Sequence, residues 1–353
     1  MEKKIPAYWK AHLSEKIEKI KKLQNEIGEH CVSFGMITDI HWSHNAQNSA
    51  VLLEKVLTEC NIPYYLNGGD VACFSPFGTR AHLKNEFDEY KKAFLGVESK
   101  CLMVFGNHDG VFSTIEESYA QNITKAERVE NGFAFLKKYP NRIFGADGTY
   151  YYCDDTASKT RYILLNTHDV PSDETDESGR AVYNTFRMFC IREEQLRWLA
   201  NEALDVPTKE WSVVLCSHEN ATAKPQHKTG NHGLILGIIN AFKHGEKFDG
   251  ETRFENEPYL NTKISVDYTG RGGNFIVWVA GHVHEDLLVK EKGIVSVATT
   301  NDSCGNASGV QAPHELGTIT EQTFDVYTVD KRLKKVYITR IGGLGSDREF
   351  YYE

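Results

Sequence analysis

The chain has 353 residues, of which 41% are hydrophobic and 11% aromatic, so it can bury a large core and general disorder is excluded. Its 40 Lys and Arg against 49 Asp and Glu give a net charge of −9, without the broad basic field that non-specific nucleic-acid binding needs. Nucleic acid is therefore a disfavoured partner, although bound metal ions would add positive charge locally.

The cysteine pattern and the apolar runs bear on location. Eight cysteines form no CxxC pair, and several lie in apolar, strand-like runs, which is typical of free thiols in a reducing compartment. The first ten residues are charged and lack the apolar region of a secretory signal. The longest apolar stretches, such as 234–239, are far shorter than a membrane span. We therefore expect a cytoplasmic protein that does not enter a membrane.

The first element in chain order is a helix. Leu13, Ile17, Ile20 and Leu23 recur at spacings of three and four, which predicts one amphipathic helix. We expect residues 1–31 to place this helix on the outside of the core. A helix that binds a partner or a membrane surface is the alternative.

Short apolar runs and helical patterns then alternate, which is typical of a layered α/β fold. Strands are predicted at 32–38, 63–67, 101–105, 162–165, 211–216 and 275–280, and helices at 49–60, 83–95, 115–139 (with breaks) and 192–204. Near the end of the chain, 323–329 and 335–339 flank Asp330 and Lys331 and predict a β-hairpin, so the sheets should be mixed. The Gly-rich, weakly patterned stretch 243–273 is predicted to be a long loop.

Five polar clusters each follow a predicted strand. They are TDIH at 38–41, NGGD at 67–70, GNHD at 106–109, CSHE at 216–219 and GHVH at 281–284. One histidine after a strand is more often solvated or satisfied than bound to a metal, so no cluster is decisive alone. Ligands of open α/β sheets bind beyond the carboxyl ends of the strands, and all five clusters would meet at that edge.

Together the clusters predict a metal centre. Asp39 and His41 are two residues apart, as are His282 and His284, so each pair would project to one side of an extended strand end. Imidazole and carboxylate groups suit first-row metals, and seven ligands are too many for one tetrahedral ion. Two ions that share a carboxylate fit this count. The candidate ligands are Asp39, His41, Asp70, Asn107, His218, His282 and His284.

The order D-x-H, G-D, G-N-H-D, a later His and G-H-x-H resembles the calcineurin-like metallophosphoesterases, from Asp39 to His284. The resemblance implies a four-layer α/β/β/α sandwich of two mixed β-sheets. In that architecture 32–300 would be the catalytic domain, and 301–353 would be a β extension that completes the same domain.

The resemblance also implies roles for the candidate ligands. Asp39, His41 and His284 would hold one metal, and Asn107, His218 and His282 the other, with Asp70 bridging both. The cofactors would be two divalent or trivalent ions; manganese, iron and zinc all suit these ligands.

The implied reaction is hydrolysis of a phosphate mono- or diester by a hydroxide that bridges the two metals. His108 and Asp70 would be catalytic. Asn107 and His108 would contact the substrate, a phosphorylated small molecule or a phosphodiester, and His44 and Asp109 are weaker candidates for that contact. His108 could stabilise the developing charge or protonate the leaving oxygen.

One position departs from related subfamilies. The residue three after the bridging aspartate is an Asp in the phosphoprotein phosphatases and a Tyr in the purple acid phosphatases, but here it is Cys73. Cys73 therefore argues against both subfamilies and leaves the orienting partner of His108 open, with adjacent Asp109 as one option. A buried structural thiol is the simplest role for Cys73, and a soft ligand is the alternative.

Two other classes of function compete with an enzyme. Some relatives of this fold are protein-binding subunits that lack metal ligands or the catalytic histidine, and a metal-dependent sensor that binds a nucleotide without turnover is a further option. All seven ligand positions and His108 are present here, which favours catalysis. Residues 166–169 (NTHD), including His168, follow a predicted strand and have no matched motif. Oligomeric state is not encoded in any of these patterns.

Overall fold

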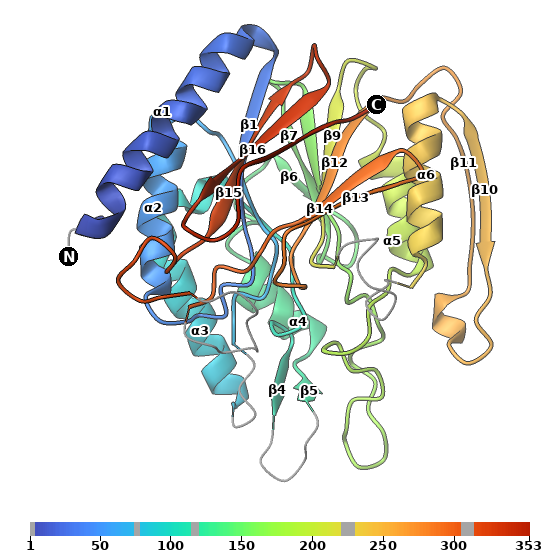
Figure 1. Ribbon diagram of the computed structural model, residues 1–353. Helices are drawn as coiled ribbons and strands as arrows, with labels where there is room; N and C mark the ends of the chain where they lie inside the picture. The colour runs from blue at the N-terminus through green and yellow to red at the C-terminus, as the bar shows by residue number, and fades with distance from the viewer. Residues whose placement is uncertain (1–3, 74–77, 114–119, 220–229, 305–313) are drawn as a thin grey trace.

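The computed structural model describes residues 4–73, 78–113, 120–219, 230–304 and 314–353 (Figure 1). Helix α1 (Lys10–Ile27) buries Leu13, Ile17, Ile20 and Ile27 and lies along the sheet formed by β15 and β16, as its periodicity predicts. Short 3-10 turns are found at Ala7–Trp9, Gly28–His30, Leu95–Lys100 and Pro258–Leu260.

The first sheet has six strands in the order β17-β16-β15-β1-β2-β3. Strands β1 (Cys31–Ile37), β2 (Tyr65–Asn67) and β3 (Cys101–Met103) run parallel and are connected through α2 (Ala46–Glu59) and α3 (Arg80–Ala93). Strands β15 (Phe324–Asp330), β16 (Lys335–Ile341) and β17 (Arg348–Tyr351) add antiparallel neighbours on the other side of β1. The predicted C-terminal hairpin is β15–β16, and it belongs to the sheet that contains β1.

The second sheet has seven strands in the order β13-β14-β12-β9-β8-β7-β6. Its central strands are parallel and its edges are antiparallel. The strands are β6 (Arg142–Phe144), β7 (Tyr151–Asp155), β8 (Thr160–Leu164), β9 (Ser212–Cys216), β12 (Asn274–Ala280), β13 (Leu287–Glu291) and β14 (Ile294–Ala298). Its outer face carries α5 (Glu193–Trp198), which continues as a π-turn at Leu199–Ala203, and α6 (His232–His244).

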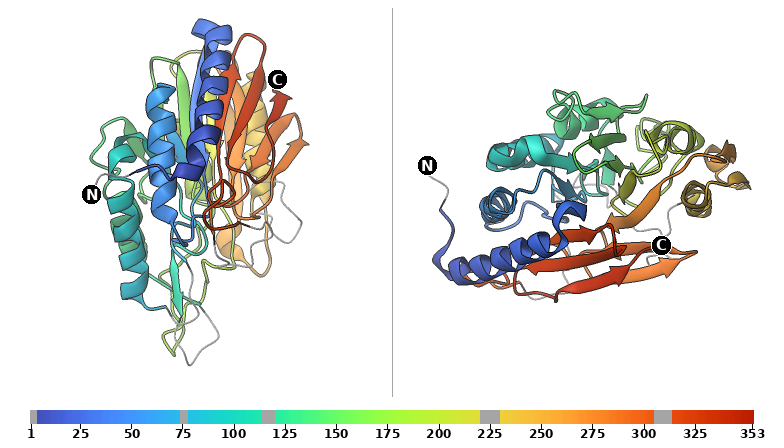
Figure 2. Two further views of the ribbon diagram at one scale, coloured as in Figure 1. Left: turned by 60° about the vertical axis from the view of Figure 1, so that its left-hand side comes forward. Right: turned by 90° about the horizontal axis from the view of Figure 1, so that it is seen from above.

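The two sheets stack face to face between two helical layers (Figure 2). Alternate residues of β9 face opposite sides: Val214 and Cys216 join the core between the sheets, whereas Val213 and Leu215 pack with α5 and α6. This alternation buries both faces of the strand, so its sequence is apolar throughout. The predicted four-layer sandwich of two mixed sheets is confirmed.

Two sequence predictions are wrong. The stretch 243–273 is not a loop, because β10 (Lys247–Thr252) and β11 (Thr262–Asp267) form a hairpin beside α6. Nor is 115–139 one interrupted helix. It contains β5 (Ala120–Asn122), which pairs with β4 (Val111–Ser113), followed by α4 (Lys125–Arg128) and a π-turn at Val129–Phe133; residues 114–119 lie outside the described part.

Two further features concern location. None of the described helices is both long and apolar enough to cross a membrane. All eight cysteines lie in the described residues, and none of them forms a disulfide.

Candidate metal centre

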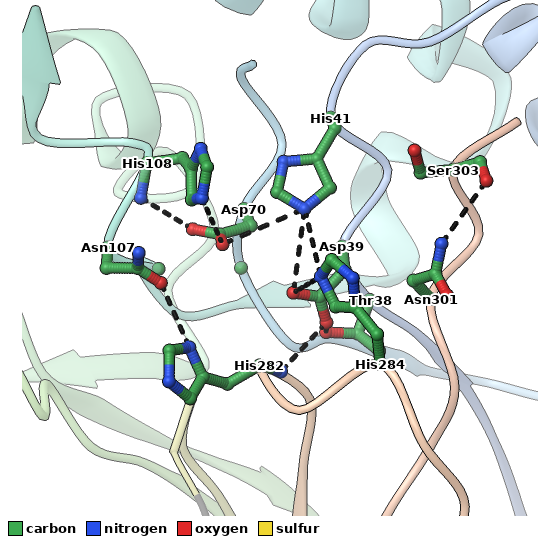
Figure 3. A network of polar contacts seen from close by, with 12 residues as sticks. Thr38, Asp39, His41, Asp70, Asn107, His108, His282, His284, Asn301 and Ser303 are labelled. Atoms are coloured by element: carbon green, nitrogen blue, oxygen red, sulfur yellow. Dashed lines mark hydrogen bonds and ion pairs between the residues drawn. The ribbon is translucent and has the colours of Figure 1, made fainter. Parts of the chain in front are cut away.

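The polar clusters meet at the carboxyl ends of the parallel strands, as the sequence predicts. Asp39 and His41 follow β1, Asp70 follows β2 and Asn107 follows β3 in the first sheet. The second sheet supplies His218 after β9, and both His282 and His284 after β12. Figure 3 shows the labelled side chains from both sheets pointing toward one another, namely Asp39, His41, Asp70, Asn107, His282 and His284. The centre therefore lies where the two sheets abut, and neither sheet alone builds it.

The backbone at this edge is bent, not extended. Left-handed φ angles occur at Asp39 (52°), His41 (47°), Asp70 (53°), His282 (69°) and His284 (54°). Such angles are uncommon for residues other than glycine and cost free energy unless the surrounding structure imposes them. The Asp39/His41 and His282/His284 pairs therefore converge through tight left-handed turns, which differs from the extended alternation expected from their spacing.

The first group of candidate ligands consists of Asp39, His41 and His284, together with Asp70. His284 Nε2 lies 3.2 Å from Asp39 Oδ1 and 3.2 Å from His41 Nε2. His41 Nε2 is 3.9 Å from Asp70 Oδ2. Two atoms bound to one ion at about 2.1 Å can be at most about 4.2 Å apart, so these distances suit a shared metal.

The second group consists of Asn107, His218 and His282, again with Asp70. Asn107 Oδ1 lies 2.9 Å from His218 Nε2 and 3.0 Å from His282 Nδ1, and the two histidine nitrogens are 3.2 Å apart. His218 Nε2 lies 3.3 Å from Asp70 Oδ2. The same Asp70 oxygen thus approaches both groups, which is the position that a bridging carboxylate requires.

The remaining atoms of these ligands are fixed by hydrogen bonds that leave the inward atoms available. Asp39 Oδ2 accepts hydrogen bonds from Thr38 Oγ1 and the His282 amide, so Oδ1 points inward. His218 Nδ1 lies 2.7 Å from the Gly68 carbonyl oxygen, so donation there leaves Nε2 unprotonated for a metal. Asp70 Oδ1 accepts from the His108 amide at 2.8 Å.

Glycine is required where β3 ends beside the bridging carboxylate. A Cβ atom at Gly106 would stand 2.0 Å from Asp70 Oδ1. Any side chain there would displace Asp70, so Gly106 provides the space for the carboxylate.

The electrostatics match a site built for cations. Burial opposes ionisation of Asp70, but the neighbouring His218, His108 and His41 hold the pKa of its carboxyl well below the usual range. Burial likewise opposes ionisation of Asp39, yet His284 and His218 hold its pKa below the usual range. Asp39 Oδ1 and His41 Nδ1 are buried without hydrogen-bond partners in the described residues. Ionised carboxylates, imidazoles and an orphaned inward oxygen fit two metal ions.

The sequence and the fold both relate this chain to known proteins. A sequence model described as calcineurin-like phosphoesterase matches residues 32–286, more than half of the chain. The chain belongs to the calcineurin-like phosphoesterase family. No curated protein matches its sequence.

Two solved structures illustrate the similarity of fold. A dimetal phosphatase from Danio rerio superimposes with a TM-score of 0.58 at 14% identity, covering 91% of this chain and 99% of that one. GAP50, the anchor in the inner membrane complex of Plasmodium, has a TM-score of 0.48 at 11% identity, covering 92% and 89%. The superposition on the Danio rerio protein shows that this phosphoesterase-family chain has the same fold as that dimetal phosphatase.

In this phosphoesterase fold, His108 stands beside the two ligand groups. Its side chain is 13% exposed, and its Nε2 lies 3.8 Å from Asp70 Oδ2. The ring contacts the rings of His41 and Phe186 edge to face, at centroid distances of 4.5 and 5.1 Å. His108 is thus held at the rim of the centre with access to a substrate. His44, by contrast, is exposed on the turn before α2.

Asp109 fits neither of the two roles expected for it, which were contact with the substrate and orientation of His108. It is fully buried, and its two oxygens accept hydrogen bonds from the amides of Asp70, Ala72 and Gly106, at 2.8–2.9 Å. The carboxylate therefore joins the turn after β2 to the turn after β3. Asp109 thus braces the turn that carries Asp70.

Replacing Asp109 by Ala leaves three buried amides without an acceptor, so we expect the free energy of unfolding to fall by about 3 kcal/mol. Urea denaturation measures this change. Asp249→Asn, at an exposed site in β10, is the control and should stay within about 0.5 kcal/mol of the parent. A loss at Asp109 no larger than that of the control would contradict the bracing function.

Cys73 is partly buried, and its amide donates to Glu86 Oε2 at 2.9 Å. Burial, with the charges of Glu86 and Asp70, raises the pKa of the Cys73 thiol to about 11. Cys73 is also in none of the clusters of described residues whose ligand atoms lie close enough together to hold a metal ion. The structural function expected for this thiol therefore suits its surroundings better than ligation does.

Sequence analysis assigned no function to two residues that adjoin the centre, His168 and Glu219. His168 follows β8 and Glu219 directly follows the ligand His218, and both are fully buried. Burial raises the pKa of Glu219 to about 7 and lowers that of His168 well below its usual value. A sequence signal existed, since NTHD and CSHE each follow a predicted strand.

Proposed function

We propose that this protein is a dinuclear metal-dependent hydrolase of phosphate mono- or diesters. The observation that carries the proposal is the single Asp70 oxygen that lies 3.9 Å from His41 Nε2 and 3.3 Å from His218 Nε2. Asp39, His41 and His284 would hold one ion, and Asn107, His218 and His282 the other. When bound, the two ions neutralise the phosphate oxygens and acidify the attacking water.

The chain's own residues contribute position and proton control. Asp70 fixes the spacing of the two ligand groups, and its Oδ1 is anchored by the His108 amide. The His108 imidazole, at the rim, donates a hydrogen bond to a phosphate oxygen or a proton to the leaving oxygen. Asn107 contributes a neutral amide oxygen and can meet the substrate at the same edge.

An aromatic side chain beside the centre, and the cavity that it lines, favour a small-molecule substrate. Phe189 contacts the ring of His282 at a centroid distance of 5.0 Å. The same Phe189 lines a cavity of about 500 Å³ together with Arg187 and Tyr259. Cavities of this size suit a small organic group, so a phosphorylated metabolite or a small phosphodiester fits better than a macromolecule. The net charge of −9 also disfavours nucleic acid as a substrate.

The eight cysteines, none of which forms a disulfide, support the predicted cytoplasmic location.

The test compares p-nitrophenyl phosphate with bis-p-nitrophenyl phosphate on metal-stripped protein that is resupplied with manganese, iron, zinc or nickel. We expect release of nitrophenol only after metal is restored. Turnover of the diester alone would identify a phosphodiesterase, and preference for the monoester would identify a phosphatase. Two bound metals without turnover of either ester would favour the non-catalytic scaffold. A protein that binds no metal would contradict the proposal.

A further inference from the structure

A buried polar pair lies beside the second ligand group and has no function in the reaction as described. Glu219 and His168 are 0% and 1% exposed. Within the described residues, neither oxygen of Glu219 and neither ring nitrogen of His168 makes a well-aligned hydrogen bond, although the Thr167 hydroxyl lies close enough to Glu219 to offset part of the rise that burial causes in the pKa of its carboxyl. Burying four polar atoms in this way is costly, so their retention calls for a ligand that satisfies them.

Distances place the Glu219 carboxylate within reach of the second ion. Glu219 Oε1 lies 3.9 Å from His282 Nδ1, and ligand atoms of His168, His218 and Glu219 are all within 4.8 Å of one another. Atoms bound to a common ion at about 2.1 Å are at most about 4.2 Å apart. The Glu219–His282 separation meets this limit without movement of the backbone.

We propose that Glu219 is an additional carboxylate ligand of the ion held by Asn107, His218 and His282, and that His168 positions it. The proposal rests on the dinuclear site of the proposed function. His168 Nε2 lies 3.3 Å from Glu219 Oε1, close enough to restrain the carboxylate, although the two atoms are not aligned as a hydrogen bond. The ring of His168 contacts the rings of Phe189 and His218, at centroid distances of 5.5 and 5.7 Å.

A separate third ion explains the same atoms less well. His218 Nδ1 is engaged by the Gly68 carbonyl, and its Nε2 belongs to the second ligand group. Among the described residues, a third ion would therefore have only His168 and Glu219 as side-chain ligands. A further ligand on an existing ion needs no new site.

The extra carboxylate changes which metal the site prefers. With Glu219, the donors are three oxygens, from Asp70, Asn107 and Glu219, and two imidazole nitrogens. Five protein donors rich in oxygen exceed the tetrahedral set that zinc prefers and suit manganese or ferrous iron. Glu219 should therefore raise affinity for manganese more than for zinc.

The first experiment measures manganese binding to the full chain by calorimetry, with no substrate present. We expect two bound ions per wild-type chain and, in Glu219→Gln, a loss of at least 10-fold in affinity at one of them. Glu86→Gln is the matched control, because Glu86 is also a buried acid whose pKa burial raises to about 7, and it contacts the Cys73 amide instead. The control should bind both ions as the wild type does. His168→Gln should weaken the same ion as Glu219→Gln, by a smaller factor, and lower the preference for manganese over zinc.

Double variants identify the affected ion. Glu219→Gln should add no further loss to His282→Ala, because both act on one ion, whereas combined with His284→Ala it should weaken both ions. Wild-type affinity in Glu219→Gln would overturn the inference and leave the proposed function standing. A wild-type chain that binds no manganese, iron or zinc would instead overturn the proposed function.

A crystal structure of the manganese-loaded wild type provides an answer that does not depend on how the variants fold. We expect Glu219 Oε1 to be bound directly to the ion that His282 holds. A water molecule in that coordination position, with Glu219 outside it, would overturn the inference.

Discussion

Asp70→Asn is expected to lower turnover by about 10³-fold or more while the fold is retained. Asp70 Oδ2 is the atom that approaches both ligand groups, and its negative charge offsets part of the charge of two cations. Asparagine has the same shape but is neutral, so the chain loses the shared anion and keeps the amide contacts around it. Steady-state kinetics and metal analysis on the same sample measure both effects.

The control for Asp70→Asn lies in the same sheet, at the opposite end of its strands, where Asp330 pairs with the first residue of β1. Asp330 is buried at the end of β15, where its Oδ1 accepts from the amides of Arg332 and Leu333. Asp330→Asn removes a buried charge far from the centre, so kcat and metal content should match the wild type. Full activity in Asp70→Asn would show that the ligand assignment is wrong.

His108→Gln is expected to lower kcat by about 10²–10⁴-fold with both metals still bound. His108 is not assigned to either ligand group, although its ring lies within 4.8 Å of ligand atoms of His41 and Asp70, and its side chain is 13% exposed. Glutamine can donate a hydrogen bond but cannot deliver a proton at neutral pH. The loss should therefore be largest for substrates with a poor leaving group and smaller for nitrophenyl esters.

His30→Gln, on an exposed turn before β1, is the matched control and should leave the kinetics unchanged. Loss of metal from His108→Gln would show that His108 is a ligand. An unchanged kcat for every leaving group would exclude it from proton transfer.

The sequence was sufficient to predict the layers and the seven candidate ligands, because each motif sits at the end of an apolar strand. Parallel strands bring such ends to one edge whatever the lengths of the connections. The bounds predicted for the strands observed as β1, β9 and β12 differ from the observed bounds by at most one residue at each end.

Other features depended on context that is not local. In α6 the run Leu234–Ile239 is apolar on every side, and such a run is compatible with either a helix or a strand. In β11, Thr262, Ile264 and Val266 are buried alternately, a period of two that is short and interrupted by charge. Glu219 follows a ligand histidine, yet only the arrangement of β8 beside β9 brings His168 to it.

The pairing of β1 with β15 has a consequence for how the chain comes to be folded. Cys31 pairs with Asp330, so the strand that leads into Asp39 and His41 has one neighbour, β2, that follows it closely in the sequence and another, β15, that is made much later. Until β15 emerges from the ribosome, one edge of β1 has unpaired amide and carbonyl groups, which is a template for association with other chains. Closing so long a loop is slow. The chain is therefore vulnerable to aggregation through the whole interval before the β15–β16 hairpin covers that edge.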